Sequence, residues 1–138
     1  MSYFTDADEV YATLGKLFSN LATDPDLGPR LRRANTTVQF AYRDPESQIT
    51  IRLDEDAEPR IDLGPTDLAP EVTMTSDADI AHRFWLGRVN ITLAMARGEI
   101  RAEGPMPKLM ALMPITEEVF PRYRAMLAAD GRQDLIEA

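Results

Sequence analysis

The residue types that most often carry catalysis are scarce in this chain. His82 is the single histidine, and cysteine is absent, which excludes a thiol nucleophile and a cysteine metal site. A serine hydrolase would need His82 beside a serine and a carboxylate, but none of the serines stands in a G-x-S-x-G turn. We therefore interpret His82 as a satisfied histidine at the surface or boundary of the fold, and we predict no catalytic residue.

Acidic residues cluster at two places where a metal ion or an acid–base pair could be held. Asp54, Glu55 and Asp56 form a run, but the spacing of a calcium-binding EF-hand is absent, so a solvated turn is favoured. Glu117 and Glu118 open a predicted helix, where carboxylates interact favourably with the helix dipole. We expect no metal, no cofactor and no enzymatic activity.

The length and composition are those of one soluble domain. The chain has 138 residues, of which 44% are hydrophobic, and we expect a single domain over residues 1–131 with a frayed tail at 132–138. No apolar run approaches the roughly 20 residues of a membrane-spanning helix. Without cysteines or the features of a signal peptide, the expected compartment is the cytoplasm.

The charge balance argues against nucleic-acid binding. A formal net charge of −8 repels a phosphate backbone. Arg30, Arg32 and Arg33 form a local basic cluster, for which a solvated helix end is favoured over a patch that docks on anionic lipid.

The first half of the chain changes from a helical to a strand periodicity. Residues 5–22 carry an apolar stripe at helical spacing, and Pro25 and Pro29 then restrict residues 24–34 to a turn and at most a short helix. Alternating apolar residues predict a meander of three antiparallel strands, at 38–42, 49–53 and 61–63.

Short helices and strands follow in the second half. Ser76 is expected to start a helix, with Asp79 in the capping-box position and Gly87 at its end. Asn90 caps a second short helix, and Pro114 is expected to end a later, methionine-rich helix. The other expected elements are strands at 72–74 and 100–102, the methionine-rich helix at 106–113, and a last helix from Thr116 to Gly131.

The order of these elements and the spacing of three glycines match a known family. Leu86 and Gly87 precede a short helix, Gly98 precedes a strand centred on Ile100, and Gly104 precedes the methionine-rich helix. In these features the chain resembles the sterol carrier protein 2 domain over most of its length. One departure is Pro105, which stands where aspartate is common but suits the first turn of a helix.

The resemblance implies an α+β fold, with a five-stranded, mainly antiparallel sheet covered by helices. It also implies an elongated apolar tunnel between sheet and helices that accepts fatty acids, phospholipids, sterols or similar molecules. The same fold recurs as an accessory domain on unrelated enzymes, so function does not follow from fold alone.

The tunnel would be lined by apolar residues, several of them methionines. Methionine is unbranched and adaptable, so a cavity that it lines accommodates chains of differing shape, although a methionine stripe also serves simply as core packing. We expect Met110→Arg to abolish ligand binding. The candidate ligand-binding residues are Phe40, Ile51, Phe84, Trp85, Met95, Ile100, Met106, Leu109, Met110, Met113, Phe120 and Tyr123.

Two functions remain open at this point. The leading one is non-enzymatic binding and intracellular transfer of a lipid or another hydrophobic small molecule, with transient membrane contact. The alternative is an accessory or interaction module with a collapsed tunnel, which serves a partner enzyme of lipid or aromatic metabolism. A cavity below about 300 Å³ would favour the second, because such a space is small for a drug-sized or lipid ligand.

Overall fold

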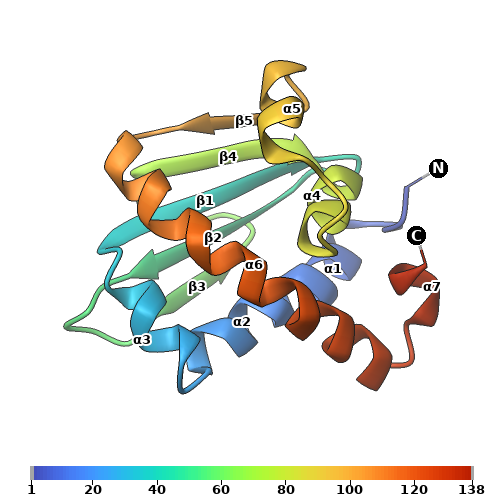
Figure 1. Ribbon diagram of the computed structural model, residues 1–138, viewed down its shortest axis with the longest axis horizontal. Coiled ribbons are helices and arrows are strands. Elements are labelled where there is room, and N and C mark those ends of the chain that lie inside the picture. The colour runs from blue at the N-terminus through green and yellow to red at the C-terminus, as the bar shows by residue number, and fades with distance from the viewer. Residues whose placement is uncertain (1, 138) are drawn as a thin grey trace.

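A computed structural model describes residues 2–137 and shows one five-stranded sheet with helices packed on one face (Figure 1). The strand order is β3-β2-β1-β4-β5. The strands are β1 (Thr36–Arg43), β2 (Ser47–Leu53), β3 (Arg60–Leu63), β4 (Val72–Asp77) and β5 (Ile100–Glu103). The helices are α1 (Ala7–Val10), the π-helical turn η1 (Tyr11–Gly15), α2 (Lys16–Thr23), α3 (Leu27–Arg32), α4 (Ala78–Trp85), α5 (Ile91–Ala96), α6 (Met106–Ala129) and α7 (Gln133–Ile136).

The sheet confirms the predicted meander and the mainly antiparallel pairing. β1 pairs antiparallel with β2, β2 with β3, and β4 with β5, while β1 and β4 form the single parallel pair of the sheet. Side chains alternate between the two faces of a strand, so residues paired across strands share a face. Phe40 is paired with Ile49 on one side and with Met74 on the other, and this apolar face is the one that the helices cover.

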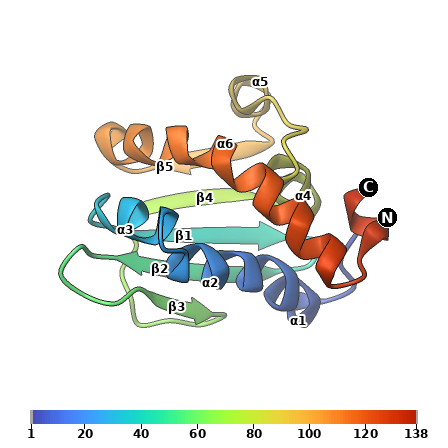
Figure 2. The ribbon, with the colours of Figure 1, turned by 60° about the horizontal axis from the view of Figure 1, so that its bottom comes forward.

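The N-terminal helical region forms one layer over the sheet. α1, η1 and α2 follow one another without a break, and the Asp6 side chain caps the first turn by accepting a hydrogen bond from the Glu9 backbone N–H. The apolar stripe of this region is buried, as predicted. Figure 2 shows α2 in front of the strands, with α6 crossing above it.

The start of α4 differs from the prediction. Ser76 and Asp77 belong to β4, and the helix begins at Ala78 because the strand pairing with β1 and β5 extends this far. Asp79 therefore forms no capping box, and its carboxylate instead accepts a hydrogen bond from the Tyr3 backbone N–H at 2.9 Å.

Two predicted helix boundaries are confirmed: Gly87 at the end of α4 and Asn90 at the start of α5. Gly87 has φ +81°, the left-handed conformation of a helix-ending glycine. A Cβ at Gly87 would lie 3.0 Å from the Phe120 ring, so the position has both a conformational and a steric reason to be glycine. Asn90 caps α5 through its side-chain oxygen, which accepts a hydrogen bond from the Leu93 N–H at 3.0 Å.

The prediction that Pro114 ends a helix is wrong, because α6 runs without a break from Met106 to Ala129. A proline inside a helix removes one backbone hydrogen bond and crowds the preceding turn, but packing on both sides outweighs this cost here. Ile115, which follows Pro114 directly, and Val119, one turn later, are buried in the core. Within residues 2–137, no helix is both long and apolar enough to cross a membrane.

The C-terminal segment, expected to be frayed, is folded as far as it is described. Residues 133–136 form α7, and Leu135 is buried in the core. Arg132 holds this segment in place through ion pairs with Glu9 at 3.2 Å and Asp134 at 3.1 Å. The contact with Glu9 could not be expected from a local pattern, because Glu9 lies at the opposite end of the chain.

Candidate ligand cavity

A cavity of about 120 Å³ lies between the apolar face of the sheet and the helices. We call it the main cavity. Its walls come from α2, α3 and α6, from β1, β2 and β4, and from the segment that carries α4 and α5. The lining residues are Phe18, Leu21, Ala22, Leu31, Val38, Phe40, Ile51, Leu53, Val72, Met74, Phe84, Trp85, Ile91, Leu109, Leu112, Met113, Ile115, Thr116 and Val119.

The main cavity is almost purely apolar. Among the described residues that line it, none carries a charge. Thr116 has a polar side chain, but its hydroxyl donates a hydrogen bond to the Met113 carbonyl at 2.7 Å, which leaves little to offer a ligand. An apolar cavity of comparable size stays dry and takes up small hydrophobic molecules such as benzene. The walls therefore favour hydrocarbon or aromatic groups and oppose ions.

Aromatic rings close one end of the main cavity. Phe18 from α2 stacks on Phe40 from β1 with ring centroids 4.8 Å apart, and Trp85 from α4 meets both rings edge-on at 5.7 and 6.4 Å. Such pairs are favoured beyond the area that they bury.

A second, smaller space adjoins the main cavity near β5. This pocket of about 30 Å³, which we call the side pocket, lies between the helices α4 and α5 and the strands β1, β4 and β5. Its lining residues are Phe40, Tyr42, Met74, Ser76, Ala81, Phe84, Trp85, Ile91 and Ile100.

The structure brings together about half of the residues that the sequence singled out. Lining the main cavity are Phe40, Ile51, Phe84, Trp85, Leu109 and Met113, and Ile100 lines the side pocket. Phe120 packs over Gly87, and Tyr123 is fully buried in the core. Their part in ligand binding stays a prediction.

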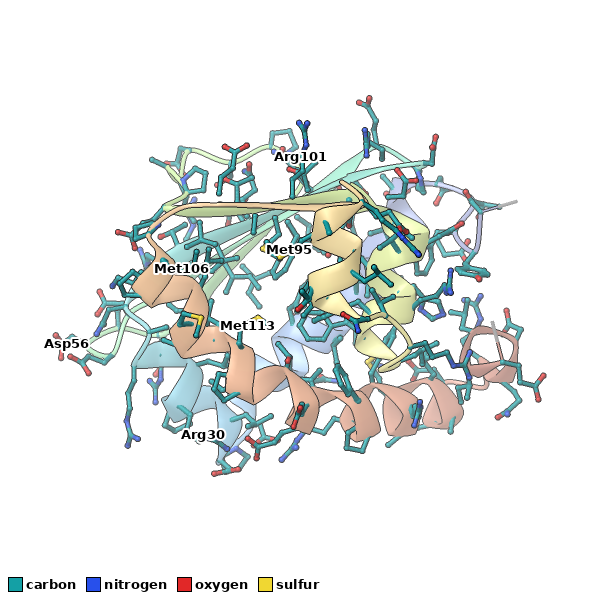
Figure 3. The ribbon with its side chains drawn as sticks, turned by 45° about the horizontal axis from the view of Figure 1, so that its top comes forward. Arg30, Asp56, Met95, Arg101, Met106 and Met113 are labelled. Atoms are coloured by element: carbon teal, nitrogen blue, oxygen red, sulfur yellow. The ribbon has the colours of Figure 1, made fainter. Side chains whose placement is uncertain are left out.

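Three methionines from the prediction lie at the surface instead. Met95, Met106 and Met110 have exposed fractions of 45%, 64% and 61%. Figure 3 shows Met106 at the N-terminal end of α6 and Met113 farther along the same helix. The inward face of this helix carries Leu109, Leu112 and Met113 because the phase is set by the buried residues after Pro114. A charge placed at Met110 would therefore meet solvent.

Other lining residues were not proposed from the sequence, although the signal was present. Val38, Leu53 and Val72 occupy the same alternating face of the strands as the residues that were chosen. Phe18 and Leu21 belong to the apolar stripe of the first helix. The apolar face of the whole sheet predicts the residues that line the main cavity better than the methionine-rich segment alone.

His82 lies in the core, not at the surface or boundary. It is fully buried, with Nδ1 2.7 Å from the Tyr123 hydroxyl and Nε2 2.8 Å from the Leu135 carbonyl. Because a carbonyl only accepts, Nε2 carries the proton in the neutral ring and the Tyr123 hydroxyl donates to Nδ1. The histidine thus joins α4, α6 and α7.

Burial also sets the titration of this pair. It lowers the pKa of His82 below its ordinary value, against the opposing influence of the Leu135 hydrogen bond and the charge of Asp79. The same burial raises the pKa of the Tyr123 hydroxyl. With both ring nitrogens engaged in the core, His82 is placed as a structural residue.

Charged side chains attach α6 to α3 and to the short segment between α3 and β1. Arg30 on α3 donates to both carboxylate oxygens of Glu118, at 2.9 and 2.5 Å, and these hydrogen bonds lower the pKa of Glu118. Because α6 runs from Met106 to Ala129, Glu118 lies in the middle of this helix, and not in the first turn of a helix as expected. Nearer the N-terminal end, Lys108 donates to the carbonyls of Ala34 and Asn35 at 3.0 and 2.7 Å.

A larger groove of about 410 Å³ lies on the surface between α2 and α6. Its lining includes two ion pairs, Lys16–Asp130 at 2.7 Å and Arg122–Asp24 at 3.3 Å. Despite its volume, this groove is open and partly charged, so the main cavity is the better candidate for a hydrophobic ligand.

Comparisons with known proteins agree with this geometry. The model of the SCP-2 sterol transfer family matches residues 15–117. The solution structure of the sterol carrier protein domain 2 of Helicoverpa armigera is similar with a TM-score of 0.68 at 17% identity, covering 81% of this chain and 88% of that one. A search of curated proteins gave no match.

Two other solved structures show the same fold in different settings. The UbiJ-SCP2 ubiquinone synthesis protein has a TM-score of 0.55 at 14% identity, covering 80% of this chain and 94% of that one. The stereoselective inverting sec-alkylsulfatase Pisa1 from Pseudomonas sp. has a TM-score of 0.54 at 17% identity, covering 67% of this chain but 14% of that one. Since the family model covers well over half of the chain, the protein belongs to the SCP-2 sterol transfer family.

Proposed function

We propose that the protein binds the apolar part of a hydrophobic small molecule in the main cavity and transfers it between sites in the cell without chemical change. The observation that supports this most directly is a cavity whose described lining residues carry no charge. The absence of catalysis is part of the proposal, and it is supported by His82, whose two ring nitrogens are both engaged in the core.

The energetics suit exchange better than permanent storage. Removing a methylene group from water is worth about 0.8 kcal/mol, and a bilayer interior offers a similar gain. Transfer between a membrane and the cavity is then close to balanced. The protein needs only to shield the chain from water on the way, with transient membrane contact at either end.

The size of the main cavity determines how a ligand is accommodated. At about 120 Å³ it is smaller than the 300–1,000 Å³ of typical ligand pockets. An aromatic ring or a short stretch of alkyl chain is matched to this volume, and a longer ligand requires the helices to move outward. The N-terminal turns of α6 are suited to this movement, because Met106 and Met110 are mostly exposed and contribute little buried surface.

Mass spectrometry of material extracted from the purified, denatured protein tests the proposal. We expect co-purified hydrophobic molecules, and we expect a fluorescent acyl probe to bind and to be displaced by them. Recovery of no ligand together with no probe binding would contradict the proposal.

A pair of matched variants ties binding to the main cavity. Met113→Arg places an unpaired charge in the apolar wall and should reduce probe affinity by at least tenfold. Met110→Arg makes the same change on the exposed side of α6 and should leave the affinity unchanged. Equal effects of the two variants would show that the probe binds elsewhere. Circular dichroism and thermal melting serve as the controls for the folding of both variants.

The second candidate function is an accessory module that serves a partner enzyme of lipid or aromatic metabolism, with the interior closed to ligands. The small volume of the main cavity favours it specifically. The similarity to a ubiquinone synthesis protein and to part of an alkylsulfatase supports it further. In this case, adding the acyl probe should leave the methyl NMR signals of Leu109 and Met113 unshifted, whereas ligand binding should shift both.

A further inference from the structure

The main cavity and the side pocket are separated by side chains alone. Five residues line both spaces, so together they form a shared wall: Phe40, Met74, Phe84, Trp85 and Ile91. Met74 is the flexible member, since its unbranched side chain adopts other rotamers at low cost. Phe84 is only partly buried, which also leaves it room to turn. A modest rearrangement of these two side chains connects the two spaces.

Unlike the main cavity, the side pocket is lined by two hydroxyl-bearing residues from neighbouring strands. Tyr42 on β1 and Ser76 on β4 are paired in the parallel register, so their side chains share the helix-covered face. Their exposed fractions are 4% and 6%. Within the described part of the chain, the Tyr42 hydroxyl is buried without a hydrogen-bond partner.

Such groups are uncommon in a folded core. Most buried side-chain polar atoms have at least one hydrogen-bond partner, because leaving one unpaired costs free energy. The Tyr42 hydroxyl is unpaired, and Tyr42 lines an otherwise apolar pocket together with Ser76, so a hydrogen bond is left for a partner that enters the pocket.

The size and charge of the side pocket restrict what that partner is. About 30 Å³ matches a single hydroxyl group, a carbonyl oxygen or one water molecule. No lining residue of the side pocket within residues 2–137 carries a charge. A carboxylate or phosphate would be buried without a counter-ion, which is strongly unfavourable.

We propose that the side pocket binds the uncharged polar end of the ligand, a hydroxyl or carbonyl group, through Tyr42 and Ser76, while the apolar part fills the main cavity. This inference rests on the proposed function and narrows its ligand to a neutral amphiphile such as an alcohol or a ketone. A fatty acid would enter with its methyl end first and leave its carboxylate outside.

Trp85 provides a direct readout, because it is the only tryptophan of the chain and lines both spaces. Its fluorescence can be titrated with 1-hexanol and with 1-chlorohexane, which has a similar chain without a hydroxyl. Transfer out of water alone favours the chloride, and relative to that baseline two hydrogen bonds predict a gain for the alcohol of about fivefold to tenfold. The double variant Tyr42→Phe/Ser76→Ala should lose this gain and keep its affinity for 1-chlorohexane.

The stability of the ligand-free protein gives a second, independent measurement. Tyr42→Phe removes an unpaired buried hydroxyl and keeps the ring, so the melting temperature should stay the same or rise. A fall of several degrees would show that the hydroxyl already has a partner and would overturn the proposal.

The outcomes separate this inference from the proposed function. An affinity ratio of the two compounds that is unchanged in the double variant would overturn the polar side pocket and leave hydrophobic binding in place. Binding of neither compound would overturn both.

Discussion

The two halves of α6 belong to one continuous helix but have opposite environments. Before Pro114, Met106 and Met110 are exposed, and the inward side faces the main cavity. After Pro114, Ile115, Thr116 and Val119 still line the cavity, and the inward residues from Tyr123 onward are packed into the core. Tyr123 is fully buried against His82. We infer that the C-terminal half contributes more to the stability of the fold and that the N-terminal half is the more adjustable wall of the cavity.

The largest test of this contrast compares Leu127→Ala with Met110→Ala. Leu127 is 1% exposed in the anchored half, so its truncation should lower the free energy of unfolding by about 2–5 kcal/mol. Met110 is 61% exposed on the same helix, and its truncation should change the free energy by less than about 0.5 kcal/mol. Urea denaturation measures both, and similar losses would contradict the division of the helix.

A smaller change in stability is expected at Pro114, where the two halves of α6 meet. Pro114→Ala restores a backbone donor in the helix interior and should stabilise the protein by about 1–2 kcal/mol. It should also slow the exchange of a bound acyl probe, because the two halves become more rigidly coupled. Pro107→Ala is the matched control: Pro107 lies in the first turn of α6, where proline costs little. A gain in stability at Pro107 as large as at Pro114 would contradict this interpretation of the junction.

The anchored half should also have its own pH dependence. Burial lowers the pKa of His82 in the folded state below 6.5, so the unfolded chain binds more protons as the pH falls through this value. The contribution of neutral His82 to stability is therefore present above about pH 6.5 and decreases as the pH falls below it. Thermal melts across this range measure it. In His82→Asn the dependence should disappear, and its persistence there would assign it to other groups.

The smallest effect is expected from Lys108, which links the N-terminal part of α6 to the segment after α3. Lys108→Met removes the hydrogen bonds to the Ala34 and Asn35 carbonyls and should cost about 0.5–1.5 kcal/mol of stability. Probe release should become several-fold faster, as measured by stopped-flow displacement. Lys16→Met, which breaks the ion pair with Asp130 at the anchored end, should leave the release rate unchanged. A slower release in Lys108→Met would show that this tie does not restrain the cavity.

The sequence predicted the fold well where local patterns decide the structure. Alternating apolar residues located all five strands, and Gly87 and Asn90 marked the ends of their helices. The order of these elements with three glycines was enough to identify the family. Pro114 was misleading because its cost is local, whereas the packing that overrides it involves residues far away in the sequence.

The candidate site was harder to predict than the fold. The direction of each methionine depended on whether α6 continued past Pro114, and this reassigned Met110 to the surface and kept Met113 at the cavity. His82 could not be placed from its neighbours, because its partners Tyr123 and Leu135 are far along the chain. Contacts between distant segments, rather than local propensity, decide such positions.

Gly104 determines how the adjustable half of α6 is able to move. A Cβ there would lie 2.6 Å from the Glu71 carbonyl oxygen and 3.1 Å from the Val72 Cα, so the chain is pressed against β4 just before the helix begins. The segment from Met106 to Met113 is thus restrained at its start by Gly104 and at its end by the core. We therefore expect any outward movement to be largest in the middle of this segment and smallest at its two ends. A ligand would therefore enter beneath the middle of this segment, and a bulky side chain at Gly104 would displace its first turn.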